Sequence, residues 1–151
     1  MDQIPTQPPG IDSEAYRPDA RARALLRGVQ IAEADLRASG GAFDLQQVRT
    51  LLRGVSRQRI AKQTRDGGLL AVPGPSNRRY YPTVQFQPDG SVVPGLKAVT
   101  EALATRNPWA ILNFLVQPDD RLNGRTPIDR LKAGAIGEVV DAARSLHQQG
   151  T

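Results

Sequence analysis

The chain has 151 residues, no cysteine, one histidine and a formal net charge of +5. This composition excludes a disulfide framework and a thiolate or imidazole-rich metal site. No apolar run approaches the roughly 20 residues that a membrane-spanning helix needs, and the first residues lack the basic and apolar regions of a secretory signal. We therefore expect a cytoplasmic protein with one domain or two very small ones.

The positive charge is concentrated in one quarter of the chain. Residues 1–43 carry five basic and six acidic side chains, residues 44–81 carry eight and two, and residues 82–151 carry seven of each. Localised positive charge suits a polyanionic partner, because each phosphate that it neutralises releases condensed counterions. The distribution predicts that residues 44–81 bind nucleic acid.

The N-terminal part predicts a tail and one helix. Residues 1–17 are rich in Pro, Gln and Gly and have no hydrophobic periodicity, which predicts a disordered tail. Residues 18–40 have apolar residues at spacings of three and four, which predicts a helix used as a scaffold or for dimerisation. The predicted apolar stripe consists of Ala22, Leu25, Val29, Ala32 and Leu36.

Residues 41–90 fit a winged helix-turn-helix domain. Asp44 and Gln47 have the spacing of a capping box, and Ser56 suits the cap of a second short helix. Two short helices joined by a turn that contains glycine are typical of a helix-turn-helix. Residues 69–72 and 78–82 then predict two strands joined by the turn cluster PGPSN. Such a hairpin would form the wing.

The second predicted helix has an apolar side with Ile60, Ala61 and Thr64 and a basic side. Arginine, lysine and glutamine are the side chains that contact base edges or hold phosphates, so double-stranded DNA is the expected partner. The candidate DNA-binding residues are Arg57, Gln58, Arg59, Lys62, Arg65, Arg78 and Arg79. The alternative is a solvated basic face, although such a face usually mixes both signs of charge.

Residues 91–151 predict a small helical bundle with balanced charge. Asn107-Pro108 and Thr126-Pro127 each combine a capping residue with proline at the first helical position. The fold class expected for the chain is therefore mainly α, with an N-terminal helix, a small winged helix-turn-helix with a β-hairpin, and a C-terminal helical bundle.

Two resemblances to known families follow from these segments. The stretch VSRQRIAKQTRDGGLLAV, with the arginine-containing turn and YYP after it, resembles the winged helix-turn-helix of MerR-like and excisionase-like DNA-binding proteins. Residues 96–149 resemble the toxin-binding domain of Xre/MbcA/ParS-type antitoxins. The second resemblance is carried by Trp109, Leu112, Leu115, Pro118, Leu122, Gly124, Thr126, Pro127, Leu131, Gly134, Val139 and Val140.

The second resemblance implies an antitoxin that holds a RES-type toxin, an NAD-degrading enzyme with an ADP-ribosyltransferase-like fold. It also implies autoregulation by binding operator DNA as a dimer or larger assembly. Most of the motif positions are better explained by core packing than by partner contact, so we expect a toxin to contact polar surface residues instead. These candidates are Asp119, Asp120, Arg121, Asn123, Arg125, Asp141, Arg144 and Gln148.

No combination of residues indicates catalysis. His147 stands alone near the C-terminal end, and the adjacent side chains of Asp119 and Asp120 do not converge on one atom. The glycine and lysine spacing of a phosphate-binding loop is absent. We expect a protein that is not an enzyme and that needs no metal or cofactor.

Three interpretations of function remain. The chain is an antitoxin-like DNA-binding transcriptional regulator, a DNA-binding regulator or nucleoid-type protein without a toxin, or a module that binds an acidic protein or RNA. A homodimer at least is expected, because specific DNA readers commonly pair two half-sites.

Overall fold

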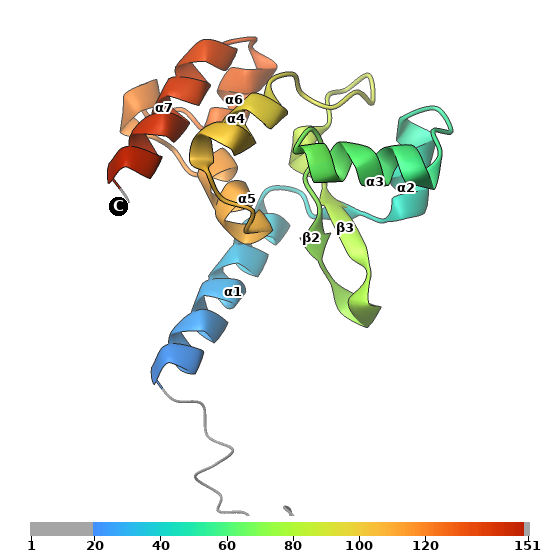
Figure 1. Ribbon diagram of the computed structural model, residues 1–151, viewed down its shortest axis with the longest axis horizontal. Coiled ribbons are helices and arrows are strands. Elements are labelled where there is room, and N and C mark those ends of the chain that lie inside the picture. Colours follow the sequence, from blue (N-terminus) through green and yellow to red (C-terminus); the bar gives the residue numbers. More distant parts are fainter. Residues whose placement is uncertain (1–19, 150–151) are drawn as a thin grey trace, which may run out of the picture. The chain divides into compact units, whose positions relative to one another are not determined.

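The computed structural model describes residues 20–149, which divide into two compact units at Ile31 (Figure 1). Helix α1 (Ala20–Ala38) confirms the first predicted helix. The predicted tail and the side chains of Leu25, Val29 and Ala32 lie outside the described residues. None of the described helices has the length and apolar character needed to cross a membrane.

The two helices of the helix-turn-helix begin at the residues that the sequence predicts. The Asp44 side chain accepts the Gln47 backbone N–H at 2.8 Å, and the Gln47 side chain accepts the Asp44 N–H at 2.9 Å. This capping box starts α2 (Leu45–Leu51). The Ser56 hydroxyl accepts the Arg59 N–H at 3.1 Å and starts α3 (Arg57–Asp66), which ends at Gly67 with a left-handed φ of 88°.

Three short strands form one small antiparallel sheet in the order β1-β3-β2. They are β1 (Ala42–Phe43), β2 (Val72–Pro73) and β3 (Arg79–Pro82). The predicted hairpin is the β2–β3 pair, with Val72 opposite Tyr80. The strand predicted at residues 69–72 is wrong for Leu69, Leu70 and Ala71, and β1 was not predicted.

Gln85 explains why Leu70 is not part of a strand. It lies at the end of a short 3-10 helix, η3 (Thr83–Gln85), and it is fully buried. Its Oε1 accepts the Leu70 N–H at 2.8 Å, and its Nε2 donates to the Leu70 carbonyl at 2.9 Å and to the Pro82 carbonyl at 3.1 Å. The side chain therefore bonds the backbone as a neighbouring strand would. It links Leu70, which precedes the hairpin, to Pro82, which ends it.

The C-terminal bundle contains α4 (Leu96–Leu103), α5 (Pro108–Val116), η4 (Asp120–Leu122), α6 (Pro127–Lys132) and α7 (Ile136–Gln149). In Figure 1 these helices lie together, to one side of α2, α3 and the hairpin. The mainly helical architecture with a small wing confirms the predicted fold class. The side chains of Asn107 and Thr126 accept backbone N–H groups at the starts of α5 and α6, as the sequence predicts.

Two hydrophobic clusters lie within the described part of the larger unit, residues 32–149. One lies under the helix-turn-helix and contains Val48, Ile60, Leu69, Tyr81 and Phe86. The other fills the C-terminal bundle, and Leu70 belongs to it although it lies next to Leu69 in the chain. Adjacent leucines thus enter different clusters, which ties the wing to both parts of the unit.

Candidate nucleic-acid interface

Helix α3 is anchored by one side and presents charged and polar side chains on the rest of its surface. Ile60 is fully buried, whereas Gln58, Arg59, Lys62 and Arg65 are exposed. An α-helix turns by about 100° per residue, so Gln58, Lys62 and Arg65 lie within one narrow sector. Arg59 lies farther round, on the side away from that of Ala61.

A hollow of about 620 Å³, called the first hollow below, separates the start of α3 from the wing. Its cationic lining residues are Arg57 from α3, Arg79 from β3, and Arg78, which precedes β3. Ala61 also lines it, so the hollow runs along one side of α3. Two predicted groups of arginines, 21 positions apart in the chain, therefore meet at one concave surface.

The wing is built so that its arginines lie outside the core. The side chains of Arg78 and Arg79 are exposed, while Tyr81 is 4% exposed. At the tip the Gly74 N–H donates to the Arg78 carbonyl at 2.9 Å, and the short 3-10 helix η2 (Pro75–Asn77) turns the chain. The ring of Tyr80 packs directly over Gly74, where an added Cβ would lie 2.2 Å from Cδ1.

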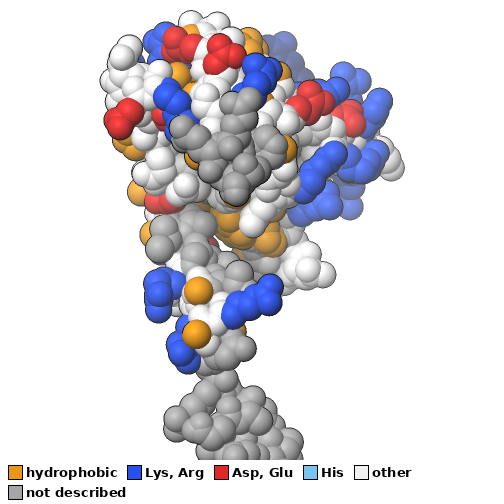
Figure 2. All heavy atoms as spheres, turned by 60° about the vertical axis from the view of Figure 1, so that its left-hand side comes forward, with side chains coloured by type: hydrophobic (Ala, Val, Ile, Leu, Met, Phe, Trp, Pro, Cys, Tyr) orange, Lys and Arg blue, Asp and Glu red, His pale blue; other side chains and the backbone are white. Residues whose placement is uncertain are grey.

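The charges around α3 and the wing agree with the excess of arginine and lysine in this part of the chain. Burial raises the pKa of the Tyr81 phenol, an effect that nearby Arg79 partly opposes, so Tyr81 is neutral at physiological pH. In Figure 2 lysine and arginine side chains gather on the right-hand side of the view and outnumber the acidic side chains among them, whereas the upper left mixes both signs more evenly. The distribution in space follows the distribution along the chain.

Not every basic residue of the segment belongs to the surface. Arg49 is half-buried, and its Nε donates to the Val55 carbonyl at 3.0 Å. Its guanidinium therefore holds the turn between α2 and α3.

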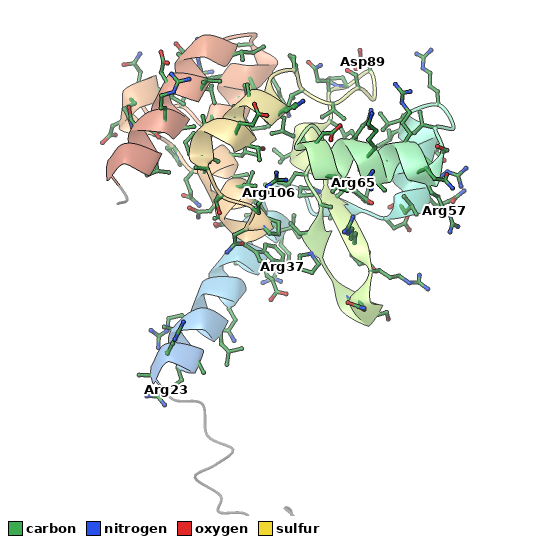
Figure 3. All side chains as sticks on the ribbon, viewed as in Figure 1. Arg23, Arg37, Arg57, Arg65, Asp89 and Arg106 are labelled. Carbon is green, nitrogen blue, oxygen red and sulfur yellow. The ribbon has the colours of Figure 1, made fainter. Side chains whose placement is uncertain are left out.

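Arg106 was not predicted as part of the site, yet its Nη1 donates to the Arg65 carbonyl at 3.1 Å, and the two residues lie side by side in Figure 3. The charge distribution along the sequence did not indicate Arg106, because residues 82–151 carry equal numbers of basic and acidic side chains.

The polar residues predicted to bind a partner lie in the C-terminal bundle, and several of them pair with one another. Arg121 Nε lies 3.0 Å from Asp119 Oδ1, and Arg144 Nη1 lies 3.2 Å from Asp141 Oδ1. The Asp119 side chain is only 10% exposed, because it also caps η4. Asp120, Asn123 and Arg125 are exposed, and the side chain of Gln148 lies outside those described.

The residues that carry the antitoxin resemblance lie mostly in the bundle core. Leu112, Leu115, Leu131 and Val139 are fully buried, and Trp109 is half-buried. Their spacing is accounted for by packing, so it bears on the fold of the bundle rather than on partner contacts. Within the described residues no cluster of three or more His, Asp or Glu side chains could hold a metal ion.

Comparison with known proteins gives one likeness in structure. No protein-family model matches the chain, and no curated protein matches it. The chain is similar to the NMR structure of Rv2175c, with 29% sequence identity and a TM-score of 0.57. The match covers 70% of this chain and 80% of that one. It therefore extends well beyond the helix-turn-helix and includes part of the C-terminal bundle.

Proposed function

We propose that this protein is a cytoplasmic DNA-binding transcriptional regulator whose α3 and wing contact duplex DNA. The observation that carries the proposal is the meeting of Arg57, Arg78 and Arg79 at the first hollow, beside the exposed polar sector of α3. Arginines from a helix and from a hairpin then face one ligand. A polyanion that is wide enough to touch both elements satisfies this arrangement.

The dimensions and chemistry of α3 suit the major groove. Its 10 residues correspond to about 15 Å of helix, and the major groove is about 12 Å wide. Gln58 and Arg65 are side chains that pair with base edges, and Lys62 suits a phosphate. In this arrangement Arg78 and Arg79 of the wing contact the sugar-phosphate backbone of the adjacent DNA strand.

The first prediction concerns Lys62, which is exposed and lies in the same sector of α3 as Gln58 and Arg65. Lys62→Ala should weaken binding to duplexes of any sequence and lower the slope of log K against log salt by about 0.9. Fluorescence anisotropy with labelled duplex DNA over a salt titration measures both quantities. Lys132→Ala, which removes the same charge from the end of α6, is the matched control and should leave the slope unchanged.

Replacing Arg59 tests, in the same assay, which side of α3 faces the DNA. Because it lies on the side of the helix away from Ala61 and the first hollow, Arg59→Ala should reduce affinity less than Arg65→Ala. An unchanged slope for Lys62→Ala together with unchanged affinity for Arg65→Ala would place the DNA surface elsewhere and remove the support for this function.

Binding of a RES-type toxin stays a prediction, and so does the homodimer. The exposed side chains of Asp120, Arg125, Asp141 and Arg144 offer a charged surface for a protein partner. Co-expression with the neighbouring gene should yield a co-purifying complex that Arg125→Glu weakens, while DNA binding by the regulator alone is unchanged.

Light scattering gives the size of the free protein and of the complex. A monomer that purifies alone would favour a DNA-binding regulator without a toxin.

A further inference from the structure

Arg106 lies between α4 and α5, outside the segment in which the positive charge is concentrated. Its bond to the Arg65 carbonyl places a guanidinium at the C-terminal end of α3 (Figure 3). The carbonyl groups at this end of a helix carry a partial negative charge, which disfavours an anion. The guanidinium opposes that charge at the Arg65 carbonyl, next to the exposed carboxylate of Asp66, the last residue of α3.

The backbone on both sides of Arg106 is held in place. Ala104 ends α4 in the left-handed region with a φ of 57°. The Asn107 N–H donates to the Thr105 hydroxyl at 3.1 Å, and the Asn107 side chain accepts the Trp109 N–H at 3.0 Å. Two helix ends thus fix the short connection that carries Arg106, so the bundle holds its backbone, and the bond to the Arg65 carbonyl orients its side chain.

A second hollow of about 270 Å³ lies between the end of α3, strand β2 and the bundle. Its charged lining residues are Arg79 and Arg106, and among the described residues that line it none is acidic. Thr64 and Thr100 also line it, but their hydroxyls donate to carbonyl groups of their own helices. The two guanidinium groups are therefore its charged donors.

We propose that Arg79 and Arg106 hold one phosphate of the DNA backbone at the second hollow, so that the C-terminal bundle takes part in DNA binding. This inference rests on the proposed function. Arg79 lines both hollows and joins this contact to the surface formed by α3 and the wing. A guanidinium has five N–H donors and pairs well with phosphate, and the bond to Arg65 occupies only one nitrogen.

The test uses the full chain and labelled duplex DNA across a salt titration. Arg106→Ala should weaken binding on the order of fivefold to tenfold near 0.1 M salt and lower the salt slope by about 0.9. Arg106→Gln keeps an amide donor for the Arg65 carbonyl without the charge, and it should show the same loss with the melting temperature of the parent. Lys132→Ala, on an element that does not line the hollow, should bind like the parent.

A double variant tests whether the two arginines share a phosphate. If they do, Arg79→Ala combined with Arg106→Ala should lower the slope little more than either change alone, whereas separate phosphates would double the loss and contradict the shared site. Binding by Arg106→Gln equal to that of Lys132→Ala would overturn the inference, and it would leave the proposed function intact if Lys62→Ala is still impaired. A parent chain that binds no duplex would overturn the proposed function itself.

Inorganic phosphate alone distinguishes the backbone of DNA from a free anion. The parent is titrated with phosphate and followed by the NMR signal of the Arg106 side chain. Saturable shifts at Arg106, together with unchanged DNA binding by Arg106→Gln, would make the hollow a free-phosphate site and overturn the inference. Competition between phosphate and DNA that disappears in Arg106→Gln supports it.

Discussion

Gln85→Leu should lower the free energy of unfolding by about 2–4 kcal/mol, because a buried donor or acceptor without a partner costs about 1–3 kcal/mol. The Gln85 side chain is fully buried and makes three hydrogen bonds to the Leu70 and Pro82 backbone. Leucine is similar in size but satisfies none of these groups. The Leu70 N–H and carbonyl would then lie in the core with neither water nor protein to pair with.

Urea unfolding measures the loss, with the fluorescence of Trp109, the only tryptophan of the chain, as the signal. Gln117→Leu is the matched control, since Gln117 is exposed at the end of α5. It should change the stability by less than about 0.5 kcal/mol, as exposed substitutions usually do. A similar small change for both variants would mean that the Gln85 hydrogen bonds contribute little to stability.

The effect of Gln85 should extend from stability to the proposed DNA surface. The side chain connects Leu70, which enters the wing, with Pro82, which leaves it. Without it the hairpin loses its fixed orientation against α3, and Arg79 loses its place between the two hollows. Binding to duplex DNA should therefore fall at temperatures where Gln85→Leu is still folded.

Helix starts were predictable because their causes are local. The capping groups of α2, α3, α5 and α6 are side chains within three residues of the N–H that they accept. Such bonds form between neighbours in the chain, so they can be recognised from spacing alone. The N-terminal helix was likewise recognisable from its apolar spacing, and its predicted start at residue 18 lies outside the described residues.

The sheet was less predictable because its partners are distant in the chain. Phe43 pairs with Tyr81, and the Thr83 N–H donates to the Gly41 carbonyl at 3.0 Å. A strand of two residues has no alternation to detect. The role of Gln85 could not be predicted for the same reason. Nothing in the sequence indicates that its side chain bonds the backbone of Leu70, 15 residues away, in the place of a neighbouring strand.

The candidate site was recognisable only in part. Counting charge identified the arginines of α3 and of the wing, because they fall in one continuous segment. It also counted Arg49, whose guanidinium holds a turn, and it missed Arg106, which comes from 41 residues beyond Arg65. Charge along the chain indicates a surface, but tertiary contacts decide which side chains belong to it.

Gly74→Ala should weaken DNA binding although it removes no charge. The backbone at Gly74 has a φ of −141°, which alanine adopts readily, so the change introduces no backbone strain. Its Cβ would lie 2.2 Å from Cδ1 and 2.5 Å from Cε1 of the Tyr80 ring. The ring or the hairpin must move, and overpacking of this kind typically costs about 1–3 kcal/mol. Because Tyr80 directly follows Arg79, the movement should displace the wing arginine and cost about fivefold to tenfold in affinity per lost phosphate contact.

A double-mutant cycle isolates the contact that causes this loss. Tyr80→Ala removes the ring, so Gly74→Ala in that background meets open space and should cost less than it does alone, with a coupling energy of about 0.5–3 kcal/mol. Gly137→Ala is the matched control: an added Cβ there has nothing within 4 Å, and alanine within α7 should stabilise the chain by about 0.5–1 kcal/mol. Urea unfolding and DNA anisotropy are measured on all the variants. Additive losses would show that Gly74 acts independently of Tyr80, whereas coupling in both measurements would show that the packing of one ring on one glycine orients the wing for its ligand.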